Sequence, residues 1–245
     1  MPREIRKKRL ADQRRRAAEH VRLVTGNMVA AGPFRGLHLG SESSWGNTCP
    51  VALLLGCYEL ELQSQIEQVI SANPKRVVDV GCAEGYYAVG FARRLPGAEV
   101  HSFDIDPAAR ALCASVADLN TVGDRIVIRV ECTHAELQSL AGADSFFFAG
   151  LRRCRAGAAG SIAVPGLAVT PVLVELHDFV DPTITSTLLA RFGPTHDVQI
   201  VTSAPRDKDA VLLLKGLPAA LRSHAVDEWR PTRPPDAVGD VYAIR

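Results

Sequence analysis

What this sequence lacks excludes several classes of protein. It has no apolar run long enough to cross a bilayer: the longest covers residues 49–58, and two prolines interrupt the apolar region at 161–176. Charged residues occupy the N-terminus, where a secretory signal needs an apolar core. The six cysteines form no C-x-x-C pair and no Cys/His cluster at zinc spacing. We therefore expect a cytoplasmic protein with reduced thiols, no membrane span and no metal.

The residues that are present have the composition of an ordinary globular domain, with 47% apolar and 22% charged residues and a net charge of +1. The charge is unevenly spread, because residues 1–22 hold nine Arg or Lys and three Asp or Glu. Two interpretations of this basic arm are open: it contacts nucleic acid or a membrane surface, or it is a solvated helix that packs one thin face on the body. We favour the helix, since no aromatic residues alternate with the cations.

The order of elements predicts an α/β domain (residues 74–245) after a basic arm and helical segment (residues 1–73). Residues 33–48 are rich in glycine and serine and predict a loop, and residues 50–72 predict a helix that ends before Pro74. Further on, β-branched runs alternate with helical stretches, which is typical of a parallel sheet covered on both faces. The expected strands are 76–80, 99–104, 125–131, 171–176, 198–202 and the final 238–245, and the expected helices are about 86–95, 107–119 and 182–192.

Two of the expected helices begin with the same dipeptide. Asp106-Pro107 and Asp181-Pro182 each place a carboxylate at the N-cap and proline at the first helical position. We expect both aspartates to accept hydrogen bonds from helix amides.

The most informative segment is VVDVGCAEGYYAVG, at residues 77–90. A strand is expected to end at Val80, and a turn with glycines at 81 and 85 leads into a helix. The spacing is not the G-x-G-x-x-G of a dinucleotide site, and no G-K-[ST] follows as in a P-loop. What remains is a turn that lets a phosphate-free ligand lie against the backbone, with helix amides facing a carboxylate. Asp79, just before the turn, can meet an ammonium group directly or through water.

This segment resembles the first motif of the class I S-adenosylmethionine-dependent methyltransferases. The resemblance implies S-adenosyl-L-methionine as the cofactor and a Rossmann-like sheet of seven strands, mostly parallel with an antiparallel final strand. It also implies that Asp79, Gly81 and Gly85 hold the methionine end of the cofactor, with Cys82 and Ala83 in the same turn.

Two further positions fit the same resemblance. Asp104 closes the next expected strand, 23 residues after Gly81, where a carboxylate can accept both ribose hydroxyls. Asp106 competes for this role, but its place before proline explains it as an N-cap. The third strand ends in Glu131-Cys132-Thr133, where the family has residues that contact adenine, so Cys132 and Thr133 are candidate contacts.

The blocks GPFRG, LLGCYELEL, VELHDF and RFGPTHD resemble the branch related to a macrolide-biosynthesis O-methyltransferase. This resemblance implies a small-molecule acceptor, a hydroxyl of a sugar or secondary metabolite. Nucleobase methylation is not expected, because the sequence has no NPPY-like tetrapeptide and its Cys49-Pro50 reverses the Pro-Cys order of cytosine enzymes. Two alternatives stay open: a non-catalytic relative that binds the cofactor, and an RNA methyltransferase that uses the basic arm. The sequence does not indicate an oligomeric state.

Candidate catalytic residues lie in VLVELHDF, where Glu175 and His177 share one side of a strand at its carboxyl end. His177 is the candidate general base for a hydroxyl acceptor, with Glu175 or Asp178 orienting it or contacting the acceptor. Alternatively, His177 caps the strand or bonds to the backbone. His196 is expected to be structural, and a metal held by these four residues matches no known template.

The family pattern breaks at residues 145–166, SFFFAGLRRCRAGAAGSIAVPG. Related chains have an acidic stretch like DVEG and a helix like ELLDP, whereas no acidic residue occurs here between Asp144 and Glu175. One explanation is divergence, with a damaged acceptor site. The other is a pair of compensating frameshifts across roughly 146–163, because codons for residues 153–162 can be chosen that read DVELELLDP one base later. The frameshift predicts low local order and weak activity, with cofactor binding partly retained.

Overall fold

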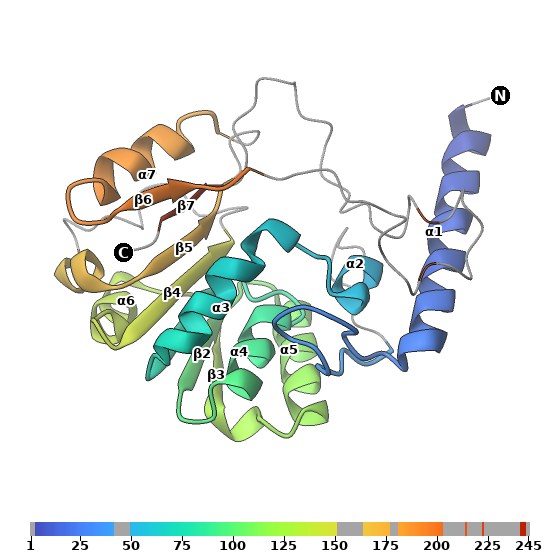
Figure 1. Cartoon of the computed structure of the whole chain (residues 1–245), viewed down its shortest axis with the longest axis horizontal. Helices are drawn as coiled ribbons and strands as arrows, with labels where there is room; N and C mark the ends of the chain where they lie inside the picture. The colour runs from blue at the N-terminus through green and yellow to red at the C-terminus, as the bar shows by residue number, and fades with distance from the viewer. Residues whose placement is uncertain are drawn as a thin grey trace.

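A parallel sheet of five strands lies at the centre of the chain, in a computed structural model that describes residues 3–41, 50–150, 164–176, 181–202, 214, 222 and 241–243 (Figure 1). The strand order is β3-β2-β1-β4-β5. The chain therefore runs outward from β1 to β3 and returns to the other side of β1, which makes the carboxyl ends of β1 and β4 the topological switch point. The strands are β1 (Arg76–Val80), β2 (Glu99–Phe103), β3 (Ile126–Arg129), β4 (Ser145–Gly150) and β5 (Val172–Glu175).

Helices cover both faces of this sheet. One face packs on α4 (Tyr86–Arg94), α5 (Pro107–Leu119) and the N-terminal helices α1 (Arg3–Thr25), α2 (Pro50–Leu55) and α3 (Gln63–Ala72). The other face packs on α6 (His134–Leu140), α7 (Ile184–Phe192) and the 3₁₀ turn η3 (Pro165–Val169). Two further 3₁₀ turns are η1 (Leu60–Leu62) and η2 (Gly123–Arg125).

The register explains why the strands have apolar residues on both sides. Val77 pairs with Val100 and Phe146, and these side chains belong to the core beneath α4 and α5. Val78 and its partner Phe147, one step further along, belong to the opposite core. Near-continuous apolar strands thus follow from burial on both faces, as the sequence predicts.

A second, two-stranded sheet pairs β6 (Val198–Ile200) with β7 (Val241–Ala243) in antiparallel order, and β7 lies close to β5 (Figure 1). The α/β class and the parallel order of the central strands are confirmed. A single sheet of seven strands is not confirmed, because the described hydrogen-bond ladder ends at β5 and resumes between β6 and β7.

The single helix expected over residues 50–72 is wrong. It is split into α2, η1 and α3, because the backbone turns left-handed at Gly56 (φ 71°) and Glu59 (φ 44°). The helix expected from Pro182 begins only at Ile184. Asp181 instead accepts hydrogen bonds from the amide and hydroxyl of Thr183, in a turn before α7. By contrast, Asp106 caps α5 as expected, accepting from the amide of Ala108 at 2.8 Å.

The basic arm is the helix α1, which contacts the body along a narrow face. Ala17 and Val21 are fully buried in the core, and Arg22 donates to Asn27 and to the carbonyl oxygen of Gly40. Ile5 and Leu23 remain exposed. The prediction of a solvated helix with one packed face is confirmed. No helix in the described ranges combines the length and apolar character that crossing a bilayer requires.

Candidate functional site

The turn between β1 and α4 can be built only with glycine at two positions. Gly81 and Gly85 both have φ of +88°, in the left-handed region. A Cβ at Gly81 would lie 2.9 Å from the carbonyl oxygen of Gly150, and one at Gly85 would lie 2.9 Å from the sulfur of Cys113. The glycines therefore let the turn approach the end of β4 on one side and α5 on the other.

Asp104, directly after β2, is bonded to this turn. Its Oδ2 accepts from the amide of Ala83 at 3.0 Å, and its Oδ1 accepts from the amide of Asp106 at 2.9 Å. The amides of Gly81 and Cys82 both donate to the carbonyl oxygen of Phe103. The two positions that the sequence assigns to the methionine and ribose ends of a cofactor thus lie together at the carboxyl ends of β1 and β2.

Asp79 is the most perturbed acid of the site. Its side chain is 1% exposed, and neither carboxylate oxygen has a hydrogen-bond partner among the described residues. Burial, and then the negative charges of Asp104 and Glu84, raise the pKa of Asp79 to about 7, while the backbone N–H of Ala88 in the first turn of α4 partly offsets the rise. Apart from this backbone amide, no described side chain donates a hydrogen bond to Asp79. A buried carboxylate without a side-chain partner is suited to bind a cationic group, which would compensate its charge.

The turn also buries a pair of thiols. The Cys82 side chain forms a hydrogen bond with Cys113 of α5, and this contact together with burial raises the pKa of the Cys82 thiol. Neither cysteine forms a disulfide, nor do Cys57 and Cys132. Cys82 is therefore a buried, neutral thiol, and its predicted contact with a cofactor stays a prediction.

Thr133 has a local role that the sequence analysis missed. Its hydroxyl accepts from the amide of Glu136, and the Glu136 carboxylate accepts from the amide of Thr133, which forms a capping box for α6. The T-x-x-E spacing was the available signal. Cys132, before it, is partly buried against the α6 side of the sheet. Contacts of Cys132 and Thr133 with adenine stay a prediction.

The carboxyl ends of β1, β4 and β5 lie side by side. Gly150 pairs with Glu175 across β4 and β5, and a Cβ at Gly150 would lie 3.5 Å from the Glu175 carboxylate. Gly81 approaches the carbonyl oxygen of Gly150, so Gly150 lies between Glu175 and the turn after β1. His177 and Asp178 lie outside the described residues, as does the segment 151–163 in which the family pattern breaks.

A buried hydroxyl–carboxylate pair joins the N-terminal segment to the turn. Tyr87, in the first turn of α4, donates from its hydroxyl to the buried carboxylate of Glu59, which has the left-handed φ of 44°. Burial and the charge of Glu59 raise the pKa of Tyr87. The Tyr87 ring contacts Phe148, the register partner of Asp79, with ring centroids 4.2 Å apart. The sequence carried no signal for this pair.

His196 is structural, as expected. It is 7% exposed and its Nε2 lies 2.9 Å from the carbonyl oxygen of Thr170, so Nε2 carries the proton. Its Nδ1 accepts from the hydroxyl of Thr195. Within the described part of the chain no three His, Cys, Asp or Glu side chains are grouped as metal ligands.

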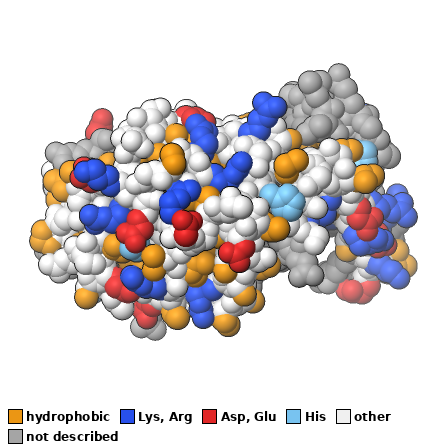
Figure 2. Space-filling model, turned by 90° about the horizontal axis from the view of Figure 1, so that it is seen from below, with side chains coloured by type: hydrophobic (Ala, Val, Ile, Leu, Met, Phe, Trp, Pro, Cys, Tyr) orange, Lys and Arg blue, Asp and Glu red, His pale blue; other side chains and the backbone are white. Residues whose placement is uncertain are grey.

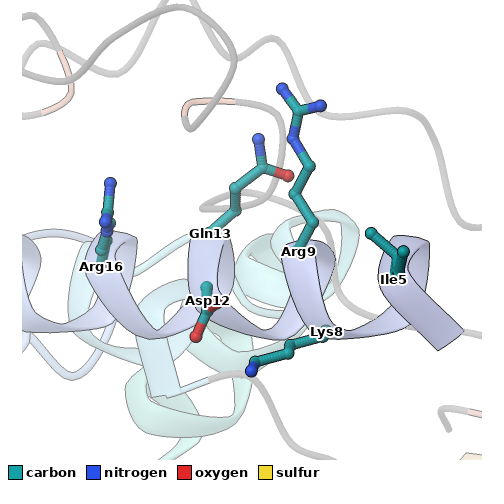
Figure 3. Close-up of a pocket in the computed structure, with 6 residues that line it drawn as sticks. All are labelled: Ile5, Lys8, Arg9, Asp12, Gln13 and Arg16. Carbon is teal, nitrogen blue, oxygen red and sulfur yellow. The ribbon is translucent and has the colours of Figure 1, made fainter.

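The exposed part of α1 carries mixed charges (Figure 2). Arg15 pairs with Glu19 at 2.7 Å and with Asp12 at 3.9 Å, which neutralises one side of the helix. Arg9 and Arg16 point to another side together with Gln13 and line a pocket along α1 (Figure 3).

Comparisons with known proteins give likenesses in structure only. No family model matches the sequence, and no curated protein is a match. Among solved structures, the SAH-bound methyltransferase PaMTH1 of Podospora anserina is 19% identical over 58% of this chain and 73% of that chain, with a TM-score of 0.39. The cofactor-bound Rv0187 from MTB is 16% identical over 58% and 74%, with a TM-score of 0.46. A SAM-dependent methyltransferase from Geobacter sulfurreducens, in complex with S-adenosyl-L-homocysteine, is 16% identical over 67% and 72%, with a TM-score of 0.42. Likenesses this distant say nothing about the ligand of this chain.

Proposed function

We propose that this chain is an S-adenosylmethionine-dependent methyltransferase that acts on a hydroxyl of a small molecule. The observation that carries the proposal is the pairing of two acids around one glycine turn. Asp79 is buried beneath the turn with both oxygens unbonded among the described residues, and Asp104 is bonded to the turn's Ala83 amide. A ligand with a cationic amine at one end and a diol at the other matches this spacing of charges.

The described residues fit this cofactor. Asp79 supplies a buried negative charge for the ammonium, and the absence of a side chain at Gly81 and Gly85 leaves the backbone of the turn open to close approach. Each carboxylate oxygen of Asp104 accepts one amide and keeps a second lone pair for a ribose hydroxyl. Cys132 and Thr133, after β3, are proposed contacts of the adenine ring.

When bound, the cofactor supplies an electrophilic methyl group. The chain's contribution is then positioning, because alignment of a hydroxyl with that methyl accounts for much of the rate of such a displacement. Glu175 lies at the carboxyl end of β5 next to Gly150, where we propose that it holds an acceptor hydroxyl. We assign the general base to His177, two residues further, which takes the hydroxyl proton as the new bond forms.

Titration calorimetry with S-adenosyl-L-homocysteine and S-adenosyl-L-methionine tests the cofactor assignment. We expect one site per chain and loss of binding in Asp79→Ala. Asp106→Ala is the matched control, because Asp106 caps α5 and is not assigned to the ligand. Binding of a nicotinamide dinucleotide in place of either compound would contradict the proposal.

Methyl release on a panel of hydroxylated sugars and secondary metabolites tests the acceptor. His177→Ala should lower turnover while the affinity for S-adenosyl-L-homocysteine stays near wild type. Cofactor binding without methyl transfer to any acceptor would favour the alternative of a non-catalytic relative. Transfer to RNA would favour the alternative that uses α1.

A further inference from the structure

Ser102 of β2 lies next to Asp79 in the sheet. The two are register partners in neighbouring parallel strands, so their side chains point to the same face, beneath α4. Ser102 is 0% exposed, and its hydroxyl, like both oxygens of Asp79, has no hydrogen-bond partner among the described residues. Buried hydroxyls and carboxylates in folded proteins are almost always bonded, because desolvation without a bond is costly. Two such groups on adjacent positions are therefore natural partners for each other.

The other groups around Asp79 do not supply a side-chain donor that favours its charge. Among the described residues that interact with it, none is a cation. The neighbouring strand β4 presents the apolar ring of Phe148. The groups that face Asp79 are the carboxylates of Asp104 and Glu84, the thiol of Cys82, and the backbone amide of Ala88.

We propose that Ser102 is a positioning residue of the cofactor site, whose hydroxyl donates a hydrogen bond to ionised Asp79, directly or through one internal water. The inference rests on the proposed function, in which Asp79 contacts the ammonium group of the cofactor. A donor at this place favours the charged carboxylate and holds its orientation. It thereby keeps the site competent for a cationic ligand at pH values where Asp79 would otherwise be protonated.

Ser102→Ala tests this pairing, with S-adenosyl-L-homocysteine titrated between about pH 5 and pH 8.5. Near the upper limit Asp79 is ionised in both proteins, so we expect affinities within about twofold. Near the lower limit we expect about tenfold weaker binding in the variant. Loss of the Ser102 hydrogen bond should raise the pKa of Asp79 by about one unit, which lowers the ionised fraction of Asp79 by about tenfold. The midpoint of the pH dependence should rise by the same unit.

Ser145→Ala is the matched control. Ser145 is also a buried serine of the parallel sheet, but it lies at the start of β4 and donates to the carbonyl oxygen of Leu140 at 2.6 Å. Its loss should lower the melting temperature and leave the affinity unchanged at every pH.

A second measurement needs no cofactor. The melting temperature of wild type should fall as pH rises from about 4 and level off below about pH 7, since the pKa of about 7 is that of a folded Asp79 without a bond from Ser102. In Ser102→Ala this fall should extend about one unit higher, and in an Asp79→Asn background the serine substitution should not change the pH dependence.

The outcomes separate the inference from the function on which it rests. An equal loss of affinity at all pH values, or no change at any, overturns the role of Ser102. If wild type does not bind S-adenosyl-L-homocysteine but the melting curves shift as expected, the proposed function fails and the Ser102–Asp79 pair stands. If wild type binds and neither pH effect occurs, the pair fails and the proposed function stands.

Discussion

At the scale of single residues, the site is governed by two carboxylates in different surroundings. Asp104 is partly exposed and satisfied by two backbone amides, whereas Asp79 is buried and has neither. Burial and the neighbouring negative charges favour the neutral form of Asp79. Asp104 is held in the turn by its two amide bonds, whereas Asp79 needs a hydrogen-bond donor or a cation beside it to be charged.

Asp79→Asn should stabilise the protein without cofactor. The folded pKa of about 7 lies above the ordinary 3.8, so Asp79 contributes stability at low pH that is lost as pH rises to about 7. Asparagine does not titrate, so the variant lacks this loss. Its free energy of unfolding should exceed that of wild type by an amount that grows as pH rises and reaches a few kcal/mol at about pH 8. Chemical denaturation at about pH 5 and pH 8 measures it. The same variant should bind S-adenosyl-L-homocysteine far more weakly, and an equal stability difference at both pH values would contradict the assignment.

Asp104→Ala should weaken cofactor binding by about 1–3 kcal/mol, because the ribose hydroxyls lose their acceptor. It should also loosen the turn, since the amides of Ala83 and Asp106 lose theirs. Calorimetry of this variant beside Asp106→Ala separates the two effects. The control loses an N-cap worth about 1 kcal/mol of stability and should bind normally. Unchanged affinity in Asp104→Ala would remove Asp104 from the site.

At the scale of elements, α6 offers a test of whether Thr133 is a cap or also a ligand contact. Thr133→Ala should lower the free energy of unfolding by about 1 kcal/mol through loss of the capping box. Thr133→Ser keeps the hydroxyl and should restore that stability. Cofactor affinity measured in both variants then separates the contribution of the threonine methyl group to binding from that of the hydroxyl. A change in affinity in Thr133→Ser would indicate contact of the threonine methyl group with the ligand.

The helix α1 should contribute to stability through its packed face and not through its charges. Ala17→Asp places a charge at a fully buried position and should cost roughly 3–5 kcal/mol. Arg9→Gln with Arg16→Gln should leave the melting temperature unchanged, because neither cation belongs to the buried face. If the double variant abolished a salt-dependent binding of RNA, the alternative of an RNA methyltransferase would gain support. Deletion of residues 1–22 is a poor substitute, since it also removes Ala17 and Val21 from the core.

At the scale of the whole molecule, the reversal of strand order brings the site together. β1 and β4 are neighbours although α4, β2, α5, β3 and α6 lie between them in the chain. This arrangement sets Gly81, Gly150 and Glu175 in one row at the carboxyl ends of the strands. A ligand at the turn therefore has Glu175 nearby, as expected for open α/β sheets at a switch point.

The frameshift hypothesis predicts that the whole chain binds S-adenosyl-L-homocysteine but transfers methyl groups weakly. The residues assigned to the cofactor lie in β1, in the turn that follows it and directly after β2 and β3, all outside roughly residues 146–163. Replacing the nine residues 153–161 with DVELELLDP should raise turnover with affinity for the cofactor nearly unchanged. A panel assay of both chains measures this, and resequencing of the gene tests the codons. Robust methyl transfer by the unaltered chain would contradict the loss of function.

Local chemistry is what the sequence by itself determined. The bounds of β1 and α5, the left-handed glycines of the turn and the cap at Asp106 follow from β-branched runs, missing Cβ atoms and an Asp-Pro dipeptide, all within a few residues of where they act. The prediction that Asp104, and not Asp106, contacts the cofactor rests on the same local signals.

Only the tertiary structure decided which distant residues meet and which are buried. Asp79 loses its solvent because α4 and β4 close over it, and Ser102 becomes its neighbour through the β1–β2 register. The break in the helix over residues 50–72 places Glu59 where it accepts from Tyr87, a contact across 28 residues. Burial and register are sums over many contacts far apart in the chain, so no local pattern carries them.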